Sequence, residues 1–210
     1  PLIDRSITAL GFDLEDVKII LGSHAHGDHQ QADVFLRGLI GAQIMILEED
    51  VPGWRRMMRD GGDIHIDRVL HDGEKVTLGG TTLVAHRTPG HTRGCTSWGI
   101  ELEENGETYD ALIVCSFGVN PNYVLINNPN YPDIAEDYRA TFAKARAMPV
   151  DVFVASHGSF YDLPAKYEML QRRQQGDPNP FVDHAGFLEY VDLKEQQFEA
   201  MFETQQRANR

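Results

Sequence analysis

The sequence is poor in cysteine, has fewer basic than acidic residues and contains no long apolar run. Two cysteines in 210 residues are too few for a disulfide scaffold. The formal net charge of -13 argues against nucleic acid as a partner, because phosphate binding requires a basic surface. No apolar stretch is long enough to span a membrane, so we expect no membrane contact. The remaining composition, 41% hydrophobic and 24% charged, is typical of a soluble globular protein.

Two further signals are missing. The Gly-x-Ser-x-Gly turn that presents a serine nucleophile in α/β-hydrolases does not occur. No signal peptide is visible, although the chain begins at Pro1 rather than at a methionine. Residues 1–12 already carry a helical apolar stripe, so we expect a single domain over 1–210 that begins partway into a fold.

The most informative stretch is a histidine-rich loop between a predicted strand at 17–21 and a predicted helix at 30–39. It holds four ligand-type side chains: His24, His26, Asp28 and His29. Imidazole and carboxylate are the ligands that borderline divalent metals such as zinc prefer. The alternative is a polar surface loop that happens to be rich in histidine, and the density of ligand types disfavours it.

The rest of the chain predicts a mixed α/β protein. We expect strands at 43–47, 75–78, 81–86, 95–103, 108–116 and 150–155, and helices at 132–148, 164–175 and 185–206. The succession of strand, helix and strand over 17–47 indicates a parallel βαβ unit. Gly79-Gly80 and Asn105-Gly106 are hairpin-turn signals. Residues 51–65 contain proline and several glycines and are interpreted as irregular.

Two more histidines, His91 and His157, lie in glycine-containing loops at the ends of predicted strands. With the first loop they make six ligand-type residues, enough for two metal ions with three protein ligands each. Three protein ligands leave a position for water, as in catalytic zinc sites. Hydrolysis by metal-bound hydroxide is therefore the indicated chemistry. Solvated, capping or packed positions are expected for the remaining candidates: His65, His71, His86, His184 and Arg93.

The two cysteines are predicted to lie near each other. If Asn105-Gly106 forms a hairpin turn, Cys95 and Cys115 come within one residue of facing each other across the ladder. We interpret them as two buried free thiols, because cysteine is often simply a small core residue.

The order His-x-His-x-Asp-His, Pro-Gly-His and Ser-His-Gly resembles that of the metallo-β-lactamase superfamily, over nearly the whole chain. Within it, residues 23–29, 85–92 and 130–138 are most similar to the subclass B3 metallo-β-lactamases. The resemblance implies an α/β fold, the αβ/βα sandwich of two mixed β-sheets flanked by helices. Here it implies a sandwich that is incomplete at the N-terminus, without the family's first strands.

The resemblance also implies a site with two zinc ions (Zn2+). One ion is held by His24, His26 and His91, and the other by Asp28, His29 and His157. Asp28 would orient the bridging hydroxide, and Ser116 would help to hold a substrate carboxylate. Some members carry a second serine two residues further on, where this chain has Gly118. A shifted alignment would instead bring the thiol of Cys115 near the second metal.

The implied function is zinc-dependent hydrolysis of the β-lactam amide of penicillins, cephalosporins and carbapenems. This would give antibiotic resistance, in a monomeric, periplasmic or secreted protein with a small-molecule substrate. The alternative is another hydrolase of the same fold, a glyoxalase II-like thioesterase or a lactonase. Those typically bridge their metals with an aspartate on the strand that here leads to Ser116, and Asp110 lies at its opposite end. A non-catalytic metal-binding or scaffold protein is disfavoured, because all six ligand positions are intact.

Overall fold

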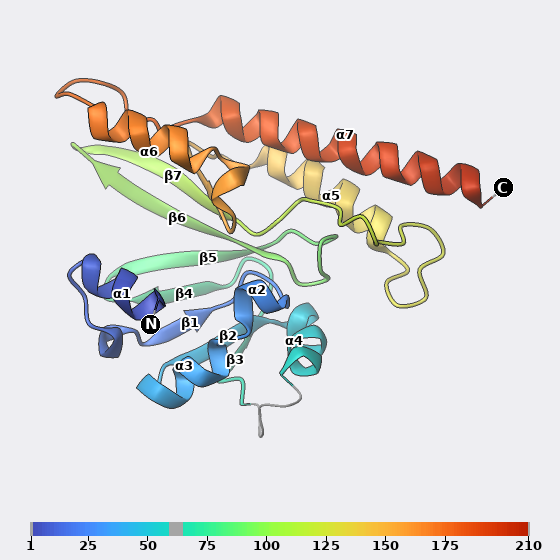
Figure 1. Ribbon diagram of the computed structural model, residues 1–210, viewed down its shortest axis with the longest axis horizontal. Helices are drawn as coiled ribbons and strands as arrows, with labels where there is room; N and C mark the ends of the chain where they lie inside the picture. Colours follow the sequence, from blue (N-terminus) through green and yellow to red (C-terminus); the bar gives the residue numbers. More distant parts are fainter. Residues whose placement is uncertain (1, 59–64, 210) are drawn as a thin grey trace.

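The computed structural model describes residues 2–58 and 65–209. Two β-sheets face each other, and helices cover their outer faces (Figure 1). Helices α5, α6 and α7 lie outside the larger sheet, whereas α3 and α4 lie outside the smaller one. This is the predicted sandwich of two sheets flanked by helices. No described helix is long and apolar enough to cross a membrane.

The smaller sheet has three strands in the order β1-β2-β3, and both pairings are parallel. The larger sheet has the order β4-β5-β6-β7-β8, with antiparallel pairings up to β7 and a parallel β7–β8 pair. Mixed pairing was expected of both sheets. It is seen in the larger sheet, whereas the described strands of the smaller sheet are all parallel. The strands are β1 (Ile19–Leu21), β2 (Gln43–Leu47), β3 (Arg68–Leu70), β4 (Lys75–Leu78), β5 (Thr81–Arg87), β6 (Thr96–Glu104), β7 (Glu107–Val114) and β8 (Val152–Ala155).

The helices connect and cover these strands. They are α1 (Leu2–Ala9), α2 (Gly27–Gln30), α3 (Asp33–Ile40), α4 (Val51–Met57), α5 (Ile134–Ala147), α6 (Leu163–Arg172) and α7 (His184–Ala208). Short 3-10 turns occur at Leu14–Asp16, Glu48–Asp50 and Gly158–Phe160. The predicted βαβ unit is present, because β1 and β2 are parallel and joined through α2 and α3.

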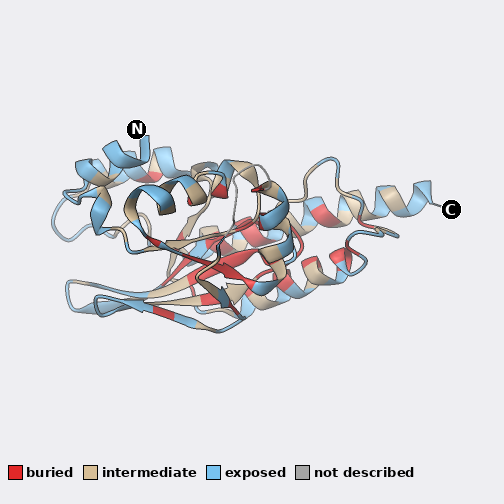
Figure 2. Cartoon of the chain, turned by 90° about the horizontal axis from the view of Figure 1, so that it is seen from below, coloured by how far each residue is buried: buried red, intermediate tan, exposed pale blue. Residues whose placement is uncertain are grey.

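Strand β2 shows how the sequence pattern builds the layers. Its side chains alternate between two faces, as in any strand. Ile44 and Ile46 pack with Trp54 of α4, whereas Met45 and Leu47 pack with Trp98 in the space between the two sheets. Both faces are covered, so four consecutive residues are buried. Figure 2 shows buried residues concentrated between the layers and exposed residues at the hairpin tips.

The largest apolar cluster lies between the five-stranded sheet and helices α5 and α7. Tyr138 and Phe142 are four residues apart, so they lie on the same face of α5. Both rings contact the ring of Phe198 on α7, with centroids 5.2 and 5.8 Å apart. This packing fixes the two helices on the sheet whose edge carries the site described below.

Both predicted hairpin turns form. Asn105 and Gly106 have φ values of 55° and 83°, and Gly79 and Gly80 have 58° and 87°. Positive φ at both central residues is characteristic of the two-residue type I′ turn, which matches the twist of the flanking strands.

One expectation about the N-terminal half was wrong, and one strand there was missed. Residues 51–57, expected to be irregular, form helix α4, because a proline in the first turn is compatible with a helix and Trp54 is drawn into the core. Residues 59–64 of that stretch lie outside the described part of the chain. Strand β3 was not predicted, since three residues are too few to show a periodicity.

Candidate metal centre

Both sheets deliver ligand-type residues to one place. Strands β5, β7 and β8 run in the same direction, so their C-terminal ends lie at the same edge of the larger sheet. His91, Ser116 and His157 follow these three strands. The histidine-rich loop that follows β1 is joined to this edge, because the backbone N–H of Thr96 donates to the carbonyl oxygen of Ser23 over 2.8 Å.

The first half-site consists of His24, His26 and His91. The ring centroids of these histidines lie 4.8, 4.8 and 4.9 Å apart. One potential ligand atom from each lies within 4.8 Å of the other two. These are the residues expected to hold one metal ion.

The second half-site consists of Asp28, His29 and His157. The Nε2 atoms of His29 and His157 are 3.1 Å apart, and Oδ2 of Asp28 lies 3.3 and 3.7 Å from them. Its ligand atoms also lie within 4.8 Å of one another. The ring centroids of His24 and His29 are 4.1 Å apart, so the two half-sites adjoin.

Hydrogen bonds define which nitrogens face the centre. His91 Nδ1 lies 2.7 Å from the carbonyl oxygen of Gly118, which can only accept, so Nδ1 carries the proton and Nε2 keeps its lone pair. Tyr123 donates its hydroxyl proton to the carbonyl oxygen of His91 over 2.7 Å. That hydroxyl can therefore only accept from His26 Nε2, 3.5 Å away, which leaves Nδ1 of His26 for a ligand.

The donor set fits a metal ion. His24 is only 1% exposed, and its Nε2 has no hydrogen-bond partner. A buried polar nitrogen without a partner is costly, and a metal ion would satisfy it. Burial is the main cause that lowers the pKa of His24, His29 and His91, the last to about 4. These imidazoles are therefore neutral near pH 7, as metal ligation requires.

The Pro-Gly-His turn requires a glycine. Gly90 has a φ of 121°, and a Cβ there would lie 2.6 Å from Cγ of Tyr138. The hydroxyl of Tyr138 donates to the same Gly118 carbonyl that accepts from His91, over 2.8 Å. The close approach of the turn to α5 thus sets the position of His91.

A buried carboxylate missed by the sequence analysis joins the two ligand-bearing loops. Asp50 is 4% exposed and accepts from the N–H groups of Ala25 (2.9 Å) and Gly94 (2.7 Å) and from the Thr92 hydroxyl (2.8 Å). Burial raises the pKa of Asp50, and these three hydrogen bonds oppose the shift. Asp50 directly follows Glu48 and Glu49, so nothing in the sequence distinguishes the buried acid from its neighbours.

Replacing Asp50 by alanine should destabilise the protein and loosen the metal centre. Three donors would lose a charged acceptor, so we expect the free energy of unfolding to fall by at least about 3 kcal/mol. Affinity for a divalent metal ion should fall roughly tenfold, as for other groups that orient metal ligands. Urea unfolding of the metal-free protein and competition with a chromophoric chelator measure the two effects. Glu48→Gln, at the exposed start of the same turn, is the control; equal behaviour of both variants would contradict this account.

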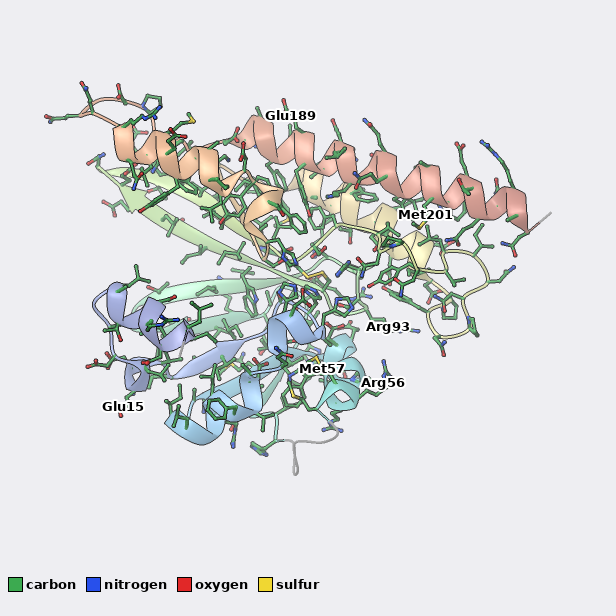
Figure 3. The ribbon with its side chains drawn as sticks, in the orientation of Figure 1. Glu15, Arg56, Met57, Arg93, Glu189 and Met201 are labelled. Carbon is green, nitrogen blue, oxygen red and sulfur yellow. A yellow bond between two sulfur atoms is a disulfide. The ribbon has the colours of Figure 1, made fainter. Side chains whose placement is uncertain are left out.

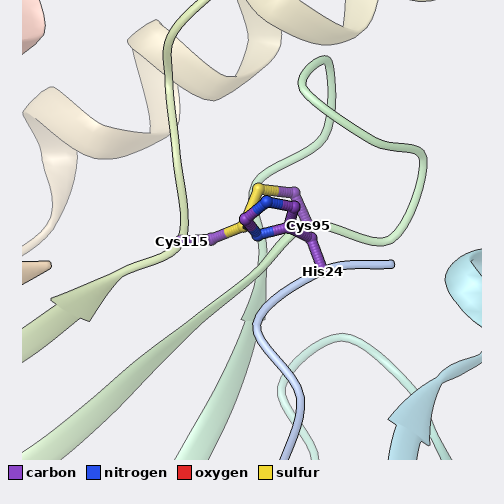
Figure 4. Close-up of side chains that lie close together, drawn as sticks. All are labelled: His24, Cys95 and Cys115. Carbon is purple, nitrogen blue, oxygen red and sulfur yellow. Dashed lines mark hydrogen bonds between the residues drawn. A yellow bond between two sulfur atoms is a disulfide. The ribbon is translucent and has the colours of Figure 1, made fainter. Parts of the chain in front are cut away.

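The two cysteines form a disulfide rather than the expected pair of free thiols. Their Cα atoms are 5.8 Å apart, within the usual range for a disulfide. The reason is the β6–β7 register, which pairs Trp98 with Ile113 and places Cys95 and Cys115 at the same end of the ladder. Sγ of Cys115 lies 3.4 Å from His24 Nδ1, so the disulfide backs this imidazole (Figure 4). A disulfide offers no thiolate, which removes Cys115 as a metal ligand.

Removing the disulfide should cost stability. The bond closes a loop with a sequence separation of 20. A double Cys95→Ala/Cys115→Ala variant should therefore lose about 3 kcal/mol of unfolding free energy in chemical denaturation. Addition of a reductant should bring the wild type to the same value and leave the variant unchanged. Two reactive thiols in the unfolded, unreduced wild type would contradict the bond.

The six ligand-type residues and Ser116 line one cavity of about 400 Å³. Ser116 Oγ accepts from the Gly118 N–H over 3.3 Å. A neighbouring cavity of about 940 Å³ borders His26 and is lined by Arg56 and Arg93, both labelled in Figure 3. Arg93 donates to the carbonyl oxygen of Asn130 over 2.8 Å, so it is not merely solvated.

The other histidines contact groups outside the centre. His65 lies 3.3 Å from Asp67, and His71 lies 3.2 Å from Glu48. His184 contacts the carbonyl oxygen of Val150, over 2.7 Å. His86, half-buried on β5, lines a separate cavity. The structure thus separates these histidines from the five that meet at the sheet edge.

Comparison with known proteins identifies the family. The sequence profile of the Metallo-beta-lactamase superfamily matches residues 2–157. The chain belongs to the metallo-beta-lactamase superfamily. Its fold is also that of solved members, so the family and fold predicted from the sequence are confirmed.

Several solved structures are similar over nearly the whole chain. The FEZ-1 metallo-beta-lactamase from Legionella gormanii is 41% identical, with a TM-score of 0.90, covering 98% of this chain and 82% of that one. BJP-1, a subclass B3 metallo-beta-lactamase of Bradyrhizobium japonicum, is 35% identical, with a TM-score of 0.88, covering 100% and 81%. The predicted resemblance to subclass B3 is therefore confirmed.

Curated relatives match a shorter region. A "Probable metallo-hydrolase" of Burkholderia pseudomallei is 33% identical over 111 residues, 48% of this chain and 36% of that protein. The mitochondrial persulfide dioxygenase of Homo sapiens is 29% identical over 99 residues, 47% of this chain and 34% of that protein. The match spans only about a third of each curated relative, and one of them is not a hydrolase by name.

Proposed function

We propose that this metallo-beta-lactamase superfamily member is a zinc β-lactamase that hydrolyses the amide bond of penicillins, cephalosporins and carbapenems. The observation that carries the proposal is the convergence of two adjoining half-sites, each with three ligand-type side chains, at one sheet edge. The similarity over 98% of the chain to a solved metallo-beta-lactamase supports the substrate class.

Two zinc ions are the proposed cofactors. His24, His26 and His91 would hold one, and Asp28, His29 and His157 the other. When bound, the ions supply Lewis-acid activation of a water molecule and of the lactam carbonyl. The chain contributes imidazoles whose orientation is set by hydrogen bonds to Gly118 and Tyr123, and Asp50 holds the loops that carry them.

We propose that Asp28 accepts a proton from the attacking water and that Ser116 binds the substrate carboxylate. The Asp28 side chain is 64% exposed, and its Oδ2 faces His29 and His157. Its other oxygen is available to orient the attacking water and to accept its proton. Ser116 Oγ accepts a hydrogen bond from the Gly118 N–H, so its own proton is free to be donated to a substrate oxygen.

The alternative is another hydrolase of this fold, a thioesterase or a lactonase. Those enzymes are expected to carry a bridging aspartate at the end of β7, where this chain has Ser116. Asp110 is paired in register with Glu101 and lines a different cavity. Among the described residues that line the site cavity, Asp28 is the one acid. This arrangement favours the lactamase.

The proposal extends to the location of the protein, its effect on antibiotic resistance and its oligomeric state. Disulfides persist in oxidising compartments, so the Cys95–Cys115 bond supports a periplasmic or secreted location. Hydrolysis of β-lactams there would give antibiotic resistance. All six proposed ligands come from one chain, so a monomer suffices for activity.

The zinc-loaded protein should open β-lactam rings, and a chelator should abolish the reaction. A panel of one penicillin, one cephalosporin and one carbapenem, followed by loss of ring absorbance and paired with metal quantitation, measures this. Restored activity on adding back zinc is the control. No turnover of any of the three together with efficient cleavage of a thioester would overturn the proposal.

Replacing His26 or Asp28 by alanine should lower kcat/KM by more than about 100-fold, because loss of even an outer partner of a ligand costs about 10–100-fold. The bound zinc should fall by about one ion per protein. His71→Ala, which changes an exposed histidine outside the centre, is the matched control and should retain activity. Two bound zinc ions and normal rates in the His26 variant would show that the ligand assignment is wrong.

A further inference from the structure

Lys194 of α7 lies at the proposed active site, although nothing in the sequence motifs points to it. It lines the same cavity as the six ligand-type residues and is the one lysine or arginine among the described residues that do so. Its Nζ lies 5.3 Å from the ring centroid of Phe160, and the Phe160 ring lies 5.1 Å from that of His157. The ammonium group is therefore on the side of the second half-site.

The Lys194 ammonium has no ionic partner in the described part of the chain. Its one hydrogen bond there runs to Oε1 of Gln197, over 3.3 Å. It also faces the Tyr190 ring, 5.5 Å away. These contacts orient a cation by weak attraction but leave its charge uncompensated. Burial without a carboxylate lowers the pKa of Lys194, since the charged form loses water and gains no counterion.

Apart from the ligand-type histidines, the other side-chain donors that line this cavity are neutral: Ser116, Asn120, Ser159 and Gln197. A carboxylate has two acceptor oxygens, and Ser116 can offer one proton. Gly118, two residues further on, has no side chain to offer a second. An ammonium group supplies up to three donors and a positive charge, and hydrogen bonds between ionised groups are roughly twice as strong as neutral ones. Lys194 thus provides the positive charge and the additional hydrogen-bond donors that Ser116 and Gly118, after β7, do not provide.

We propose that Lys194 binds the ring carboxylate of β-lactam substrates, together with Ser116. The inference rests on the proposed function and identifies a specificity-determining residue for it. In penicillins, cephalosporins and carbapenems this carboxylate is attached to the ring atom next to the lactam nitrogen. Binding at Lys194 therefore turns the lactam nitrogen towards the His29–His157 side of the centre.

A pair of substrates that differ only in this carboxylate provides the test. For the zinc-loaded Lys194→Met variant with benzylpenicillin, we expect KM to rise about tenfold and kcat to stay within about twofold, as for loss of uniform binding. With the methyl ester of benzylpenicillin, the variant and the wild type should have the same KM. Lys194→Arg should restore the low KM for the acid, because it retains the charge.

Lys75→Met is the matched control, because it removes the same charge from a residue that lines another cavity. Its KM for benzylpenicillin should equal that of the wild type, and the thermal midpoints of all variants should agree. An unchanged KM for the acid in Lys194→Met, or equal losses on acid and ester, would overturn the inference while leaving β-lactamase activity intact. A wild type that hydrolyses no β-lactam would overturn the proposed function as well.

Discussion

The site depends on one buried carboxylate. Asp50 accepts hydrogen bonds from Ala25, which lies between two of the ligand histidines, and from Thr92 and Gly94, which follow a third. Two loops from different sheets are thereby held against each other at the point where three imidazoles meet. Burying a carboxylate is expensive unless its oxygens are hydrogen-bonded, and here three donors compensate the cost. Because Asp50 binds both loops, the same hydrogen bonds set the geometry of the first half-site and hold the two sheets together at this edge.

The charge state of the centre follows from the burial of its histidines, in a chain that is strongly acidic. Burial keeps His24, His29 and His91 neutral, so they present lone pairs rather than protons. These three neutral imidazoles and the Asp28 carboxylate leave the cavity short of positive charge until cations bind. Lys194 is the exception, a partly desolvated ammonium beside Phe160. In a protein of net charge -13, attraction of an anionic substrate must be local, and the proposed zinc ions and this lysine are local sources.

The sequence predicted most of the elements because their signals are local. The turns at Gly79-Gly80 and Asn105-Gly106, the alternating faces of β2 and the apolar stripe of α5 each depend on residues close in the chain. Helix α4 and strand β3 were missed for the opposite reason. Trp54 stabilises α4 by packing against residues from β2, and β3 is too short to be recognised without its neighbour. The cysteine prediction failed on a finer point: proximity followed from the hairpin, but bond formation depends on the orientation of both side chains.

The sequence by itself determined the fold family and the residue types of the centre, because the order of the histidine motifs is a linear pattern. It also indicated that Ser116, and no acid, lies where strand β7 leads into the site. Only the tertiary structure decided which histidine nitrogens face the centre. Gly118 and Tyr123 lie far along the chain from His91 and His26, the histidines that they orient. The tertiary structure likewise decided that Asp50 is buried while Glu48, two residues earlier, is exposed, and that Lys194, in the last helix, reaches the cavity. Contacts between segments distant in the chain leave no periodicity or spacing in the sequence, so they become visible only once the sheets and helices are packed.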